Sequence, residues 1–163
     1  KSARYTSKPV RVAASVLVTG NYENPLELVP WETDFRACRL GYEQAGLGPE
    51  DVDVAECHDA FTIAEILHYE AMGFCPVGEG ARLLESGETT LGGKIPVNPS
   101  GGLLSKGHPV GATGVAQLVE GVWQLRGEAG KRQVENAQVF LAHCMGGDKD
   151  GDTRSCTINI LKI

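Results

Sequence analysis

Three short stretches of the sequence contain ionisable side chains, two of them together with glycines, and the chemistry that they offer is acid–base or nucleophilic. They are CHDAF at 57–61, GHPVGATG at 107–114 and HCMGG at 143–147. His58 and His108 can exchange a proton near neutral pH or donate a hydrogen bond to a developing oxyanion. The Cys144 thiol can act as a nucleophile or as a proton carrier. The glycines let the backbone approach a ligand and present free N–H groups to it.

Each stretch also has a purely structural explanation. His58 can cap a helix or be hydrogen-bonded in the core, and Cys144 can be a buried structural cysteine. The glycines at 107–114 can serve a turn that needs positive φ angles, and their spacing does not match the dinucleotide-binding fingerprint. His68 and the other four cysteines fall at helical or strand positions, and we expect them to be structural.

The segments around these stretches predict a layered α/β unit with a mixed sheet. Apolar, β-branched runs predict strands, and apolar residues at a period of 3.6 predict helices. The predicted strands are Val10–Val18, Val52–Cys57, Val139–Ala142 and Ser155–Leu161, and the predicted helices are Phe35–Ala45, a segment ending near Met72 and one running from Val115 to about 127. His58 then follows a strand, at the place where open α/β sheets bind ligands.

Residues 74–114 differ from the rest of the chain. They hold nearly half of the 21 glycines and few periodic apolar residues, so we predict a long, shaped loop. A loop of this length inside a compact domain is usually either functional or evidence of a wrong element assignment, and the residues here favour the first. We therefore expect residues 74–114 to be a Gly-rich active-site region within one domain, residues 1–163.

The composition is typical of a soluble, folded domain. The 163 residues are 42% hydrophobic and 22% charged, with a net charge of −6, which is outside the disordered class. The basic residues are scattered and no apolar run is long enough to span a bilayer, so we expect no nucleic acid and no membrane as partner. Five cysteines without a C-x-x-C pair argue against a metal site and against a disulfide framework.

Taken in order, the three stretches resemble the thiolase superfamily. The matching segments are HDAF at 58–61, VNPSGGLLSKGHPVGATG at 97–114, WQLRGEAGKRQV at 123–134 and HCMGG at 143–147. They are most similar to acyl-CoA thiolases of the sterol-carrier-protein-x type, and the similarity covers the C-terminal half of such an enzyme. The resemblance implies a layered α/β C-terminal domain with a mixed, mainly parallel, five-stranded sheet and covering helices.

The resemblance also implies a reaction and a role for each site residue. Thiolases catalyse thiolysis of 3-ketoacyl-CoA or the reverse Claisen condensation, with coenzyme A as a substrate and no cofactor. His108 would activate a nucleophilic cysteine, and Cys144 would carry the α-proton of the other substrate. The expected oxyanion-hole residues are His58, His108 and Gly146, and those expected to line the coenzyme A loop are Ser105, Gly107 and Phe61.

One position departs from the sterol-carrier type. That group usually has H-D-C-F, whereas residue 60 is Ala here. Cys144 would supply the missing thiol, as in ordinary thiolases. The nucleophilic cysteine belongs to the N-terminal half, and the sequence starts without Met, so we expect a fragment that is inactive by itself.

Two other functions stay open from the sequence. Thiolase-like aldol lyases of steroid side-chain breakdown pair with a small OB-fold partner, although their catalytic positions tend to hold Tyr. A non-catalytic thiolase-like subunit would keep the pocket without the nucleophile. For the acyltransferase we expect three partners: acyl-CoA or CoA, the N-terminal half, and a second copy of the full-length protein. We expect it in the cytoplasm or, in a eukaryote, the peroxisome.

Overall fold

The computed structural model describes residues 5–21, 31–149 and 152–163. Its strands are β1 (Arg11–Thr19), β2 (Val54–Glu56), β3 (Val139–Lys149) and β4 (Asp152–Lys162). Its helices are α1 (Glu32–Ala45), α2 (Thr62–Ala71), α3 (Gly80–Glu85), α4 (Gly102–Lys106) and α5 (Thr113–Arg126), with short 3₁₀ turns at Pro49–Asp51 and Gly130–Arg132. Every strand and long helix that the sequence predicts is present, and β3 and β4 are longer than expected.

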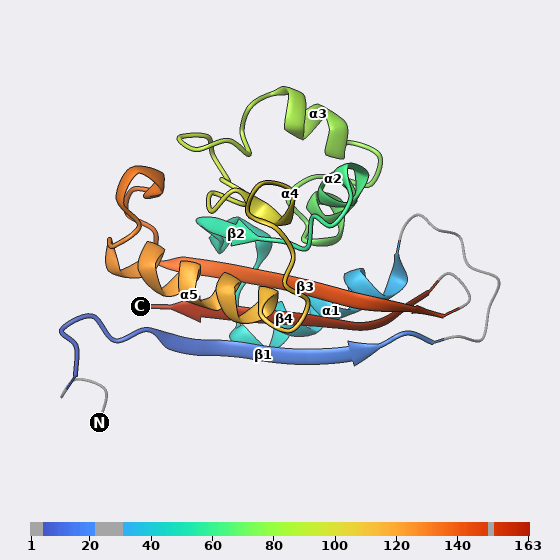
Figure 1. Ribbon diagram of the computed structural model, residues 1–163, viewed down its shortest axis with the longest axis horizontal. Helices are drawn as coiled ribbons and strands as arrows, with labels where there is room; N and C mark the ends of the chain where they lie inside the picture. Colours follow the sequence, from blue (N-terminus) through green and yellow to red (C-terminus); the bar gives the residue numbers. More distant parts are fainter. Residues whose placement is uncertain (1–4, 22–30, 150–151) are drawn as a thin grey trace.

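The four strands form one sheet in the order β1-β4-β3-β2 (Figure 1). β1 pairs with β4 and β4 with β3 in antiparallel fashion, whereas β3 and β2 are parallel. The α/β class with a mixed sheet is confirmed; within the described residues the sheet has four strands rather than five and is mainly antiparallel rather than mainly parallel. Only two residues separate β3 from β4 in the sequence, and so short a connection joins antiparallel neighbours. A further segment reaches β2 through a single parallel bridge between Ala55 and Val97.

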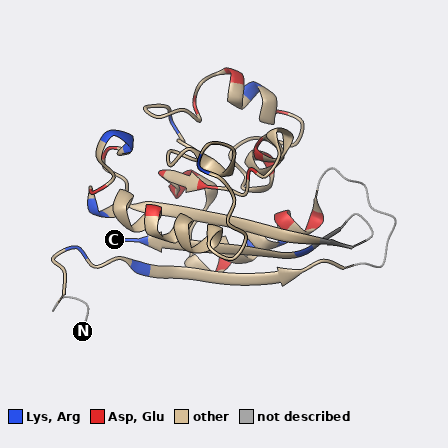
Figure 2. Ribbon diagram, in the orientation of Figure 1, with Lys and Arg blue, Asp and Glu red and all other residues tan. Residues whose placement is uncertain are grey.

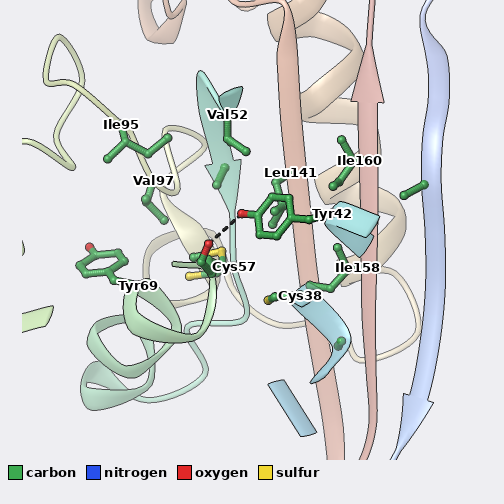
Figure 3. Close-up of a cluster of buried hydrophobic side chains, with 14 of the residues drawn as sticks. Cys38, Tyr42, Val52, Cys57, Tyr69, Ile95, Val97, Leu141, Ile158 and Ile160 are labelled. Atoms are coloured by element: carbon green, nitrogen blue, oxygen red, sulfur yellow. Dashed lines mark hydrogen bonds between the residues drawn. The ribbon is translucent and has the colours of Figure 1, made fainter. Parts of the chain in front are cut away.

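The sheet is covered on both faces, with α5 in front of it and α1 behind it in Figure 1. Leu141 of β3 belongs to the buried cluster that contains Tyr42 of α1, which Figure 3 shows. Its neighbour Phe140 belongs to the cluster that contains Leu125 of α5. This alternation follows from the two-residue period of a strand.

Glycines let both helices lie close to the sheet. A Cβ at Gly41 of α1 would be 2.6 Å from Cγ2 of Ile158, and a Cβ at Gly121 of α5 would overlap the Phe140 ring. Any larger residue at either position would push the helix away from the sheet. The two glycines therefore help to set the distance between α5, α1 and the strands.

Residues 74–114 contain more structure than expected, because α3 and α4 both lie within them. These helices have 6 and 5 residues, too few for a helical period to show in the sequence. The segment is also tied to the sheet: the N–H of Ala55 donates to the carbonyl of Pro96 (3.0 Å), and the N–H of Asn98 to the carbonyl of Ala55 (2.8 Å). With α2 it forms a layer over the β2 edge (Figure 1).

Lys and Arg lie at several separate places on the ribbon rather than in one dense patch (Figure 2). Acidic residues outnumber them, 21 to 15 in the whole sequence. Among the helices that the structure describes, none combines the length and the apolar character needed to cross a bilayer.

Candidate functional site

His58 and His108 lie side by side, although they are 50 positions apart in the sequence. Their Nε2 atoms are 3.4 Å apart, and their rings meet edge to face with centroids 4.9 Å apart. His58 lies between β2 and α2, and His108 lies between α4 and α5. The structure thus brings together two of the residues that the sequence singled out, close to the C-terminal end of β2.

A short hydrogen-bond chain indicates which nitrogen of His108 carries its proton. The hydroxyl of Thr113 donates to the carbonyl of Pro109 (3.3 Å) and lies 2.7 Å from Nδ1 of His108. With the hydroxyl proton on the Pro109 carbonyl, the Thr113 oxygen accepts from Nδ1–H of His108, and Nε2 of His108 presents a lone pair to His58. In that tautomer His108 would be the proton acceptor of the pair and His58 the donor.

The surroundings of His58 keep its imidazole neutral. Burial, together with the neighbouring His143 and His108, lowers the pKa of His58 from its ordinary 6.5 to about 4. A positive charge on this half-buried ring would face further imidazoles and would lose hydration. The neutral ring has a single N–H, which can serve either His108 or a substrate oxygen.

Asp59, the second residue of the H-D-A-F motif, holds the segment that leads to His108. Its Oδ1 accepts from the N–H of Leu103 (2.6 Å) and its Oδ2 from the N–H of Leu104 (3.4 Å). These N–H groups belong to the first turn of α4, where they have no partner within the helix. The motif therefore links the two histidine-bearing segments through a buried carboxylate.

Glu56 fixes the same segment from the end of β2. Its carboxylate accepts from the N–H of Ser100 (3.0 Å), from the Ser100 hydroxyl (2.6 Å) and from Nζ of Lys106 (3.2 Å). Burial raises the pKa of Glu56, and these donors only partly offset the rise. Glu56 is not among the site residues predicted from the sequence. The signal that could have found it is an acidic residue at the end of a short strand, just before the H-D-A-F motif.

Cys144 lies inside β3 rather than after a strand end, as the sequence had predicted, because pairing with β4 continues to Lys149. Its side chain is on the α5 side: a Cβ at Gly114 would lie 3.8 Å from Sγ of Cys144. Gly114 follows Thr113, which contacts His108. The thiol therefore approaches the helix end that also holds His108. Burial raises the pKa of Cys144, which keeps the thiol protonated.

The remaining predicted site residues lie at defined places. Gly146 is in β3 opposite Ser155, whose hydroxyl donates to the Gly146 carbonyl (3.5 Å). Ser105 and Gly107 are exposed at the C-terminal end of α4, and Phe61 is 73% exposed before α2. The oxyanion role of Gly146 and the coenzyme A contacts stay predictions.

A second group of ionisable side chains is buried behind His58. Oδ2 of Asp34 lies 2.8 Å from Nδ1 of His68 and 3.6 Å from Nε2 of His143, and all three side chains have no exposed surface. Burial raises the pKa of Asp34, but the two histidines lower it by more, to well below its usual range. The sequence predicts a purely structural role for His68, and it gives no sign of the contact between His68 and Asp34.

Asp34, His143 and Cys156 place one donor atom each within 4.8 Å of one another, which is a possible metal-ligand set. The hydrogen bonds of His143 argue against this use. Its Nδ1 accepts from the N–H of His58 (3.4 Å), so the ring proton is on Nε2, the nitrogen that faces Asp34. A protonated nitrogen has no lone pair for a cation, and the cluster fits proton sharing better than metal binding.

The family model and the similar proteins that match this chain agree with one another. Residues 28–155 match the family model described as "Thiolase C-terminal domain-like". Sterol carrier protein 2 of Rattus norvegicus is 51% identical over 145 residues, which are 86% of this chain and 26% of that protein. Acetyl-CoA acetyltransferase of Methanothermobacter thermautotrophicus is 48% identical over 145 residues, 88% of this chain and 38% of that protein.

The chain thus spans between a quarter and two fifths of the length of these relatives. A solved structure, the Ltp2-ChsH2(DUF35) aldolase, superposes with a TM-score of 0.81 over 96% of this chain and 41% of its own, at 24% identity. That likeness shows the fold. The family match covers most of the residues, including both histidine segments and Cys144, and the chain belongs to the thiolase C-terminal domain-like family.

Proposed function

We propose that this chain supplies the C-terminal half of the active site of an acyl-CoA C-acyltransferase. The reaction is thiolysis of 3-ketoacyl-CoA or the reverse Claisen condensation, with coenzyme A as a substrate and no cofactor. The observation that carries the proposal is the His58–His108 pair, a neutral donor 3.4 Å from a base. The similarity to an acetyl-CoA acetyltransferase supports the same class of reaction.

In thiolysis, Nε2 of His108 takes the proton from a nucleophilic cysteine of the N-terminal half. The thiolate attacks the 3-keto carbon, and the tetrahedral oxyanion accepts a hydrogen bond from His58. The bond between C2 and C3 then breaks and leaves an acyl-enzyme and the enolate of acetyl-CoA. Prearranged donors for such oxygens are usually the largest contribution to catalysis of acyl transfer.

Cys144 completes the proton balance. Its thiol, held in the protonated form by burial, gives its proton to C2 of the enolate, which releases acetyl-CoA. The thiolate then takes the proton of the incoming coenzyme A, whose sulfur attacks the acyl-enzyme. The nucleophilic cysteine leaves and recovers its proton from His108. Gly146 would donate its N–H to the enolate oxygen, and Ser105, Gly107 and Phe61 would contact coenzyme A.

The N-terminal half is proposed to cover the outer face of α5. Val115, Val119 and Trp123 recur every four residues along this helix and are 63%, 40% and 42% exposed. Apolar side chains repeated at this spacing form a stripe that normally packs against another element. The full-length protein is proposed to form a homo-oligomer in the cytoplasm or, in a eukaryote, the peroxisome.

The test is a thiolysis assay with acetoacetyl-CoA on the full-length protein. The proposal expects loss of the 3-ketoacyl-CoA that depends on added coenzyme A and yields two molecules of acetyl-CoA. An aldol lyase, the competing function, would instead release a ketone from a β-hydroxyacyl-CoA without added coenzyme A. Absence of both reactions would favour a non-catalytic thiolase-like subunit.

A further inference from the structure

The backbone of His58 is held at both of its polar groups by buried imidazoles. Its N–H donates to Nδ1 of His143 (3.4 Å), and its carbonyl accepts from Nε2 of His68 (3.1 Å). The two rings are fully buried, with centroids 4.2 Å apart. His58 begins the H-D-A-F motif, so this contact orients the catalytic end of β2 rather than a remote loop.

On the side away from His58, both imidazoles lie next to the carboxylate of Asp34. Asp34 lies 2.8 Å from His68 and 3.6 Å from His143 through its Oδ2. The three residues come from α1, α2 and β3, and we call Asp34, His68 and His143 the His58 clamp. In the described residues, the Asp34 oxygens and the two nitrogens facing them make no well-aligned hydrogen bond. The contact of the Asp34 carboxylate with the two imidazoles is therefore a close electrostatic one rather than a pair of aligned hydrogen bonds.

The proton positions of the clamp follow from its outer contacts. His143 accepts at Nδ1, so its proton is on Nε2 and points to Asp34. His68 donates at Nε2 to the carbonyl of His58, so a neutral His68 would turn a lone pair on Nδ1 toward the carboxylate. Two lone pairs 2.8 Å apart repel. A proton on Nδ1 of His68 would remove this repulsion; the nearby Asp34 favours it, whereas burial and His143 lower the pKa of His68.

The other titratable groups that face Asp34 do not carry charge. They are Cys38 on its own helix and Cys156 on β4, and burial and the Asp34 carboxylate raise the pKa of both thiols. His58 itself faces His108 and Asp59 in addition to the clamp. His68 and His143 are thus the groups that offset the negative charge of Asp34. Removing Asp34 or His68 leaves a buried polar group unpaired.

We propose that Asp34 and His68 are positioning residues: they act through the backbone of His58 and hold its imidazole against His108. The role in catalysis rests on the proposed acyltransferase function, whereas the effect on the His58 ring does not. Loss of the clamp would let residues 57–59 move, separate the two Nε2 atoms and admit water to the His58 ring.

The first test measures the ring directly. Hydrogen–deuterium exchange at C2 of each histidine, followed by peptide mass spectrometry on the full-length protein, gives the exchange midpoint of His58. The wild-type midpoint is expected at about pH 4. In Asp34→Asn and His68→Gln it should rise by about one unit or more, toward the value of a hydrated histidine. The matched control is Glu70→Gln, a buried carboxylate on α2 that binds the N–H of Gly80.

The second test is the kinetics of the same proteins. Both clamp variants should lose about tenfold or more in kcat with a much smaller change in KM, because His58 acts on the transition state. The double variant should be no worse than the poorer single variant, since Asp34 contacts His68 and both act through the same backbone group of His58. Glu70→Gln should match wild type.

The outcomes separate the two proposals. If folded Asp34→Asn and His68→Gln leave the His58 midpoint within about 0.3 unit of wild type, the clamp is wrong, whatever the kinetics show. If wild-type protein has no thiolysis activity but the midpoint still shifts, the clamp stands and the acyltransferase function fails. Should Asp34→Asn not fold, the kinetics of His68→Gln decide the question, because loss of His68 also removes an imidazole that lowers the pKa of His58 directly.

Discussion

Gly102 lies so close to the carboxylate of Asp59 that a Cβ at residue 102 would overlap Oδ2. Gly102 also has a φ of +60°, a region that L side chains rarely adopt. Asp59 can reach the N–H groups of α4 because residue 102 has no side chain. This fit connects the H-D-A-F motif to the segment that carries His108.

Gly102→Ala should therefore weaken both stability and activity. The positive φ alone costs about 1–2 kcal/mol for a residue with a Cβ, and the overlap would displace Asp59 from α4. Thermal unfolding and thiolysis kinetics of the full-length protein would measure the two effects. Gly46→Ala, at the C-terminal end of α1, is the control, because residue 46 has a similar positive φ but a Cβ there meets open space. Equal behaviour of the two variants would refute this account of Asp59.

Substitution of the proposed chemical groups should reduce turnover without unfolding the protein. His108→Ala removes the base and Cys144→Ala removes the proton carrier, and each should lower kcat by about 10²–10⁴-fold. Steady-state thiolysis assays would measure the loss. Cys75→Ala is the control, since this half-buried thiol lies outside the site. Wild-type turnover in both His108→Ala and Cys144→Ala would show that the site is misassigned.

The stability of the protein should fall between pH 6.5 and pH 4 because of His58. The pKa of His58 is about 4 in the folded state and 6.5 as its ordinary value, so the unfolded chain binds more protons in this window. The difference is at most about 3–4 kcal/mol, and solvent screening of a half-buried ring reduces it to about 1–2 kcal/mol. Above pH 6.5 the penalty vanishes.

Denaturant unfolding at several pH values would measure this dependence. His58→Asn, which cannot titrate, should lose less stability than wild type between pH 6.5 and pH 4. The difference between the two proteins isolates His58 from the other histidines. Parallel curves for wild type and His58→Asn would contradict the lowered pKa.

Helix α1 should be sensitive to added volume where it meets the sheet. Gly41→Ala would gain about 1 kcal/mol of helix propensity but would place a Cβ 2.6 Å from Cγ2 of Ile158. Overpacking of this kind costs about 1–3 kcal/mol, so we expect a net loss of stability in thermal unfolding. Gly114→Ala, whose Cβ would be at an ordinary 3.8 Å from Sγ of Cys144, should be neutral or stabilising.

The sequence predicted the elements well because their signals are local. Apolar runs and helical periods located the four strands and the long helices. Sheet topology is not local: the antiparallel majority depends on β3 and β4 forming a continuous pair through Cys144 and Gly146. Glycines at 146 and 147 suggested a strand end, whereas pairing to β4 carried the strand past them.

The site was predictable where residues belong to motifs and unpredictable where they do not. His58, His108 and Cys144 stood out by type and spacing. Asp34 and His68 lie on ordinary amphipathic helices, and only tertiary packing brings them behind His58. Glu56 and Asp59 could have been suspected as acids next to an apolar strand, but their targets, the N–H groups near α4, are invisible in the sequence.

The alternation of side chains along β3 has a further consequence for residues 143 and 144. His143 faces Asp34 on one side of the sheet, and Cys144 faces Gly114 on the other. A slip of one residue between β3 and β4 would exchange the two, burying the thiol beside a carboxylate and turning the imidazole toward α5. Cys144 pairs with Thr157, whose hydroxyl donates to the Cys144 carbonyl (3.0 Å). This pairing sets the strand register that places His143 beside Asp34 and Cys144 beside Gly114. An insertion or deletion in the β3–β4 hairpin should therefore disrupt both placements together, even where every side chain is retained.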